Sequence, residues 1–187
     1  MRDSATLNVP YEDLNHSYGH LKNSLNGGYT RIDPVKIDLE MAAFLQEGLP
    51  AHIATRNAQL EPAGARVTAI KVDADCEHVT VFLPAIAAPP LLDDLRDNGQ
   101  LAVVLARPID ERSCQVKGRF VESWTPTPEE EAFAREQFDR ALAAVERVGI
   151  PRLGSTAWQM LPCVAVRFRA EALFTQTPGP NAGARLP

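Results

Sequence analysis

The sequence lacks the features that mark several protein classes. It holds three cysteines, Cys76, Cys114 and Cys163, widely spaced and without a C-x-x-C pair. This argues against a disulfide framework and against a zinc site. No stretch reaches the roughly 18 apolar residues of a membrane helix, and the first residues form no apolar signal core. We therefore expect reduced thiols in a cytoplasmic protein without a membrane partner.

Familiar catalytic motifs are absent as well. The sequence contains no G-x-S-x-G, no P-loop and no G-x-G-x-x-G, so the hydrolase, kinase and Rossmann dehydrogenase classes lose their usual support. The formal net charge of −5 gives no general attraction to nucleic acid or to anionic membranes. A local basic cluster can still bind one anionic ligand.

What is present fits one globular domain. Apolar residues make up 45% of the 187 residues and charged residues 23%, an ordinary globular composition. Residues 1–37 are polar and without sustained periodicity, so we expect an N-terminal arm or extension, followed by one domain over 38–187. His16 and His20 lie four residues apart in this arm, but Gly19 disfavours the helix that would pair them on a metal.

Three helices carry terminal signals. Asp38 is a candidate N-cap for a short helix that Gly48 ends, and Pro89-Pro90 opens a second helix that ends at Asn98-Gly99. Thr127-Pro128-Glu129-Glu130 combines an N-cap, a proline at the first helical position and a capping-box glutamate. The spacing predicts a long third helix that Gly149 and Pro151 end.

Six segments have strand character, and six strands with about three helices favour a mainly β fold, an antiparallel barrel with peripheral helices. In the second segment, alternation places Arg66, Thr68, Ile70 and Val72 on one face. The fourth segment is continuously apolar and suits a strand buried on both faces, and Gly118 in the fifth indicates a bend, a bulge or close backbone approach. The segments are 49–56, 64–72, 78–83, 101–106, 114–124 and 163–174.

The segment Gln-Val-Lys-Gly-Arg at 115–119 stands directly after a predicted helix and an apolar strand. With this segment as the most specific part, residues 38–176 resemble the pyridoxamine 5′-phosphate oxidase-like, FMN-binding split-barrel family. The resemblance implies a six-stranded antiparallel split β-barrel that forms a homodimer, with two FMN sites at the subunit interface and a small-molecule substrate. The other matching stretches are 65–68, 79–83, 98–104 and 114–122.

The resemblance also implies cofactor-binding residues. Arg66 would hold the FMN phosphate, with Val67 and Thr68 beside it on the strand, and Gln115 and Lys117 would face the flavin ring or the substrate. The alternative is that these side chains mark the solvated side of a half-exposed strand. One stretch departs from the family: residues 83–90 contain neither the hydroxyl nor the lysine that usually completes the phosphate site.

The functional expectation is a flavin-dependent oxidoreductase whose substrate the sequence does not identify, since the flavin would carry the chemistry. The alternative is a non-catalytic flavin- or haem-binding protein for storage or sensing, and a third possibility is a haem enzyme. His52 is interpreted as a hydrogen-bonded structural histidine. Trp124 and Trp158 are interpreted as packing residues rather than as stacking platforms for a planar ligand.

Overall fold

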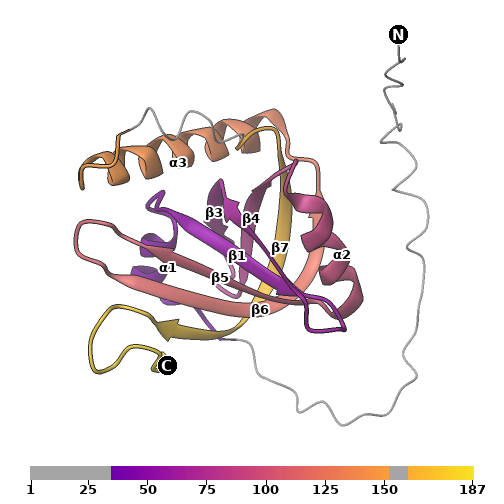
Figure 1. Ribbon diagram of the computed structural model, residues 1–187, viewed down its shortest axis with the longest axis horizontal. Coiled ribbons are helices and arrows are strands. Elements are labelled where there is room, and N and C mark those ends of the chain that lie inside the picture. The colour runs from indigo at the N-terminus through magenta and orange to yellow at the C-terminus, as the bar shows by residue number, and fades with distance from the viewer. Residues whose placement is uncertain (1–34, 152–159) are drawn as a thin grey trace. The chain divides into compact units, whose positions relative to one another are not determined.

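The structure is a computed structural model that describes residues 35–151 and 160–187 (Figure 1). The predicted arm therefore lies almost entirely outside the described residues, as do His16, His20 and Trp158. Residues 35–37 already pack with the barrel, because Ile37 is 2% exposed in the core and the Val35 amide donates to the carbonyl of Ala170. The arm remains a prediction for the preceding residues.

The fold is mainly β, and its elements follow the predicted order. The helices are α1 (Leu39–Leu45), α2 (Ala88–Asn98) and α3 (Pro128–Glu146). The strands are β1 (Ala51–Arg56), β2 (Pro62–Val67), β3 (Ala69–Val72), β4 (His78–Pro84), β5 (Gln100–Ala106), β6 (Ser113–Trp124) and β7 (Cys163–Thr175). The described sheet thus has seven strands, where the sequence predicted six.

The extra strand arises at Thr68, which divides the predicted second strand. β2 pairs with β1, whereas β3 pairs with β4 on the other side of the barrel. A continuous strand cannot serve both partners, so the chain bends at Thr68. The Thr68 amide donates to the carbonyl of Phe82 (2.8 Å), and the Thr68 hydroxyl donates to the carbonyl of Met160 (2.9 Å).

The strand order explains how the sheet closes. The order is β2-β1-β5-β6-β7-β4-β3, with antiparallel pairing throughout. The two edge strands are consecutive in the chain, with only Thr68 between them, so the sheet curls until its edges meet there. This arrangement confirms the predicted antiparallel split barrel.

The bend also makes the predicted alternation of the second strand wrong. Arg66 is exposed, whereas Ile70 and Val72 lie in the barrel core. On β2 the core side chain is Val67, an odd-numbered residue, and on β3 the core side chains are even-numbered. The bend at Thr68 reverses the faces, so Arg66 does not share a face with Ile70 and Val72.

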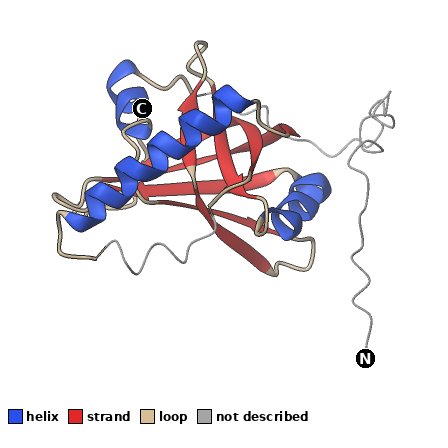
Figure 2. Ribbon diagram, turned by 90° about the horizontal axis from the view of Figure 1, so that it is seen from above, coloured by secondary structure: helices blue, strands red, loops and turns tan. Residues whose placement is uncertain are grey.

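Two apolar clusters hold the helices to the barrel. The main cluster fills the barrel and includes Phe44 of α1 and Leu91 of α2, so both short helices pack on it. A second cluster lies under α3, where Ala134 packs on Phe82 and Ala165 from the outside of the sheet. Figure 2 shows α3 lying across the strands, with α2 at one side. Helix α3 therefore covers the outer face of β3, β4 and the first part of β7.

The outer face of β1 and β5 is open in the described part of the chain. Leu101, Val103 and Leu105 point into the core, but Ala102 and Val104 are half-exposed. The expectation that this apolar run is buried on both faces is therefore wrong for the single chain. Among the described residues, Ala102 and Val104 thus leave part of the apolar surface of this strand in contact with solvent.

Local signals placed the helix starts correctly. The Asp38 carboxylate accepts from the Met41 amide (2.7 Å), which confirms the predicted cap of α1. At α3, the Thr127 hydroxyl accepts from the Glu130 amide and the Glu130 carboxylate accepts from the Thr127 amide, a complete capping box. The end of α3 comes earlier than predicted, at Glu146, and Val148 beyond it is exposed.

Replacement of Thr127 by alanine is expected to lower the free energy of unfolding by about 1 kcal/mol, because the Glu130 amide loses its partner. Thr125→Ala is the matched control, since Thr125 is an exposed threonine outside the helix. Urea denaturation followed by circular dichroism measures both changes. Equal stability of the two variants would contradict the cap.

The cysteines agree with the expectation of reduced thiols. All three are free, and Cys114 and Cys163 are buried in β6 and β7. Burial raises the pKa of both thiols to about 11, so they stay protonated near neutral pH. Among the described helices, none combines the length and apolarity needed to cross a membrane. The cytoplasmic location stays a prediction.

Candidate cofactor-binding site

Two of the predicted site residues lie on one line across the sheet. Arg66 on β2 is opposite His52 on β1, which is opposite Val104 on β5, which is opposite Gln115 on β6. Residues in register on neighbouring strands lie about 5 Å apart and project to the same face. We call this line of residues 66, 52, 104 and 115 the upper row. It brings Arg66 and Gln115 onto the same open outer face.

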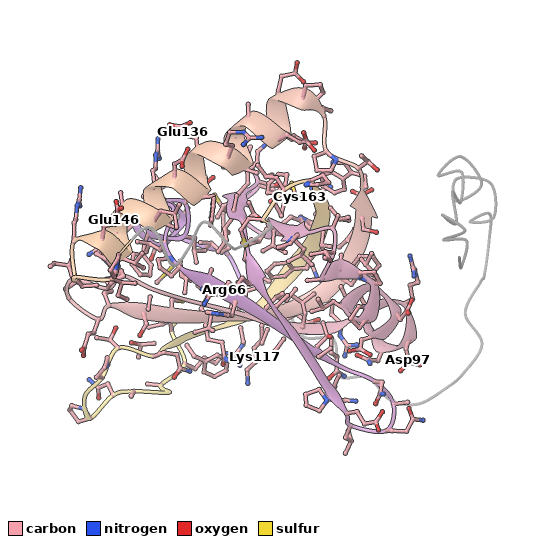
Figure 3. The ribbon with its side chains drawn as sticks, turned by 45° about the horizontal axis from the view of Figure 1, so that its top comes forward. Arg66, Asp97, Lys117, Glu136, Glu146 and Cys163 are labelled. Atoms are coloured by element: carbon pink, nitrogen blue, oxygen red, sulfur yellow. The ribbon has the colours of Figure 1, made fainter. Side chains whose placement is uncertain are left out.

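Lys117 belongs to the next line on the same face. It is opposite Ala102, which is opposite Ala54, which is opposite Gly64. These small residues make a flat floor beside the exposed lysine. The Lys117 ammonium lies 4.9 Å from the centre of the Phe174 ring, a cation–π contact. Figure 3 labels both cations and shows Arg66 nearer α3 and Lys117 farther from it.

Val67 and Thr68 are placed differently. The Val67 side chain is 6% exposed and belongs to the core, so only its backbone borders Arg66. Thr68 is 3% exposed, and its hydroxyl donates to Met160. The structure thus gives both residues a role in closing the barrel, and their contact with a cofactor stays a prediction.

Sequence reasoning did not include His52 in the site, although it lies next to Arg66 in the upper row. Partial burial of the imidazole, together with the positive charge of Arg66, lowers the pKa of His52 below its ordinary value of 6.5. The ring is therefore neutral near pH 7 and offers one donor and one acceptor to a ligand. Only the strand register reveals this neighbour.

The pKa of His52, measured by NMR titration, is expected below 6.5, and Arg66→Gln is expected to raise it by removing the charge. The imidazole of His52 takes up a proton less readily in the folded protein than in the unfolded chain. His52 therefore lowers the free energy of unfolding as the pH falls below about 6.5. His52→Gln should therefore lose less stability than the parent between pH 7 and 5. A pKa at or above 6.5 in the parent would contradict this arrangement.

The departure in residues 83–90 is also visible in the structure. The Ala85 amide donates to the carbonyl of Pro162 and the Ala87 amide donates to the carbonyl of Pro84, both at 2.9 Å. Pro89 and Pro90 have no amide hydrogen at the start of α2. These four positions offer no free donor to a phosphate, so a phosphate bound nearby would depend more on the positive charge of Arg66.

A small hollow adjoins Arg66. Its volume is about 30 Å³, and it lies between β2 and the second half of α3, with Phe138 and Met160 in its wall. Ligand pockets for cofactors measure roughly 300–1,000 Å³. This hollow alone is too small for a cofactor, so a cofactor in contact with Arg66 would extend onto the open face.

Larger hollows lie elsewhere, and in each of them an arginine is already paired with carboxylates. In a groove of about 740 Å³, Arg167 binds Asp73 (2.7 Å) and Glu122 (3.3 Å), and the Trp124 indole donates to Glu130. This agrees with the interpretation of Trp124 as a packing residue. In a hollow of about 310 Å³, both carboxylate oxygens of Glu47 accept from Arg107.

The donor set of the open face fits a flat anionic ligand such as FMN. Arg66 provides a guanidinium whose fork suits phosphate oxygens. Gln115 provides an amide that can meet the polar edge of a flavin ring. The floor formed by Gly64, Ala54 and Ala102 leaves room for a planar ring, because no large side chain rises from it.

Comparison with known proteins gives matches among solved structures. No protein-family model and no curated protein matches the chain. HupZ from Group A Streptococcus is 16% identical, with a TM-score of 0.49 over 79% of this chain and 100% of its own. An F420 reductase is 16% identical, with a TM-score of 0.49 over 70% of this chain and 93% of its own.

An FMN-binding protein from Syntrophomonas wolfei subsp. wolfei is 12% identical, with a TM-score of 0.45 over 75% of this chain and 87% of its own. These matches agree with the family resemblance predicted from the sequence. At such identities the likeness concerns the fold alone, and the site rests on the chain's own geometry.

Proposed function

We propose that the chain binds FMN on the outer face of β2, β1, β5 and β6 and acts as a flavin-dependent oxidoreductase. The observation that carries the proposal is the upper row, which places exposed Arg66 in line with Gln115 across four strands. Names of similar structures, an F420 reductase and an FMN-binding protein, point in the same direction.

In this proposal each residue has a defined task. Arg66 binds the phosphate, Gln115 hydrogen-bonds the ring edge, and Lys117 provides positive charge near the substrate. When bound, FMN would supply hydride transfer, which no side chain of the described residues can perform alone. The chain's own residues bind the cofactor, orient it and exclude water from one of its faces.

The cover that the site needs is, in our proposal, a second copy of the chain. Ala102 and Val104 are half-exposed members of an apolar strand, and Ala54 beside them is exposed. Pairing two such faces removes apolar surface from water and turns the flat floor into the cleft that the 30 Å³ hollow cannot provide. The proposed assembly is a homodimer with ligand sites at its interface.

The test is an absorbance measurement followed by reduction. Protein incubated with FMN and then desalted should keep a flavin spectrum, and addition of NADH or NADPH without air should bleach it. A retained spectrum that neither donor bleaches would favour the non-catalytic alternative of flavin storage or sensing. Loss of all flavin on desalting, together with a monomer in analytical ultracentrifugation, would overturn the proposal.

A further inference from the structure

Three arginines gather at the end of the open face farthest from Arg66. Arg119 on β6 is directly opposite Arg169 on β7, and Gln100 on β5 is opposite Arg119. Arg56 on β1 donates to the side-chain oxygen of Gln100 (3.1 Å), which places it at the other end of the same line. We call Arg56, Gln100, Arg119 and Arg169 the arginine row. It brings together residues that are up to 113 positions apart in the chain.

The charges of the arginine row are not balanced. Glu171 is the one carboxylate that pairs with it among the described residues, at 3.6 Å from both Arg119 and Arg169. That distance exceeds the 2.7–3.2 Å of a good hydrogen bond, so Glu171 attracts both guanidinium groups without occupying their donors. Like charges directly opposite each other on neighbouring strands are destabilising.

Part of the donor capacity is nevertheless in use. Arg119 donates to the carbonyl of Asn98 (3.0 Å), and Arg56 donates to the carbonyl of Asn57 (3.2 Å). These contacts hold the two stems in place, and each guanidinium has five N–H donors in total. The side chains of Arg119 and Arg169 are 36% and 41% exposed. The row is therefore held by its neighbours and still presents donors to solvent.

A second arginine on β7, Arg167, has its positive charge paired with nearby carboxylates. Arg167 lies two residues before Arg169 and binds Asp73 at 2.7 Å and Glu122 at 3.3 Å. The same strand thus carries one arginine paired with separate carboxylates and one that shares a single distant carboxylate. This contrast separates a structural arginine from one that is available to a ligand.

We propose that the arginine row binds an oxyanion, a phosphate or carboxylate group of a small molecule. The guanidinium groups of Arg119 and Arg169, together with the Gln100 amide, suit such a group. Arginine binds planar or tetrahedral oxyanions with paired hydrogen bonds. Along β1, Arg56 lies four residues from His52 of the upper row, about 13 Å at 3.3 Å per residue. One phosphate cannot reach both rows.

This separation extends the proposed function, on which the next step rests. If FMN places its phosphate at Arg66, the anion that binds the arginine row is not the FMN phosphate. It belongs to another molecule, the substrate. The substrate class is then an anionic small molecule that carries a carboxylate or phosphate. The binding of an anion to the row does not itself depend on FMN.

The experiment compares Arg169→Gln with Arg167→Gln as the matched control on the same strand. Pyrophosphate and citrate are titrated by calorimetry at low salt, and melting temperatures are measured without ligand. Arg169→Gln should weaken anion binding about tenfold, the effect of losing a charge-assisted contact, while melting at the same or a higher temperature. Arg167→Gln should melt at a lower temperature with unchanged anion affinity. Binding of one probe alone identifies phosphate or carboxylate as the preferred group.

Unchanged anion affinity in Arg169→Gln would overturn the arginine row as a binding site, and so would a lower melting temperature without an affinity change. FMN titration of the same variants separates this outcome from failure of the proposed function. If the protein binds pyrophosphate but does not bind FMN, the arginine row is supported as an anion site and the proposed flavin function is overturned. Anion binding lost in Arg66→Gln but not in Arg169→Gln would assign the anion to the upper row and overturn the arginine row.

Discussion

Replacement of Gly118 by alanine is expected to destabilise the barrel by about 3 kcal/mol, the upper part of the usual range for overpacking. A Cβ at this position would overlap the carbonyl of Arg169 and the ring of Phe168. Lys117 is opposite Ala172, and Gly118 is opposite Ala170, so Glu171 is the extra residue of a β-bulge. The glycine lets the bulged strand approach closely, which confirms the bulge and close approach expected from its mid-strand position.

Urea denaturation of Gly118→Ala measures the loss, and Gly64→Ala provides the control. At Gly64 a Cβ would lie 3.3 Å from the carbonyl of Ile53, tight but without overlap, so a change of about 1 kcal/mol or less is expected. A Gly118 variant as stable as the Gly64 variant would show that the two strands can separate at the bulge without cost.

Arg66→Gln is expected to weaken FMN binding by roughly tenfold to a hundredfold, because charge-assisted hydrogen bonds contribute about 1.5–3 kcal/mol. The effect should be large since Ala85 and Ala87 already donate to backbone carbonyls and two prolines follow. Quenching of FMN fluorescence measures the dissociation constants.

Lys71→Gln is the control for Arg66→Gln. Lys71 is an exposed cation on β3, beyond the bend at Thr68 and outside the upper row. Its removal changes the net charge of the protein by the same amount without touching the proposed site. An equal loss of affinity in the two variants would mean that Arg66 acts through net charge and not through contact with the phosphate.

The sequence predicted those parts of the fold that depend on neighbouring residues. The caps at Asp38 and Thr127 satisfy amides three positions away, so their sequence pattern is sufficient. The bend at Thr68 depends on the carbonyl of Met160, 92 positions away, and no local pattern contains that contact. The seventh strand was missed for this reason.

The sequence predicted which residues form the candidate site, but it did not predict how they are arranged in space. The family resemblance selected Arg66 and Gln115, and the strand register then placed them on one line. His52 entered the site only through that register. The arginine row was missed because a bulge at Glu171 sets the pairing of Arg119 with Arg169, and alternation along one strand does not predict a bulge.

The most direct test of the central claim compares FMN with riboflavin, which has the same ring without the phosphate. Binding to the unmodified protein should be at least about tenfold tighter for FMN, since Arg66 would contact only the phosphate-bearing ligand. Equal binding of the two flavins, or no binding of either at micromolar concentration, would contradict a phosphate-directed flavin site on this face.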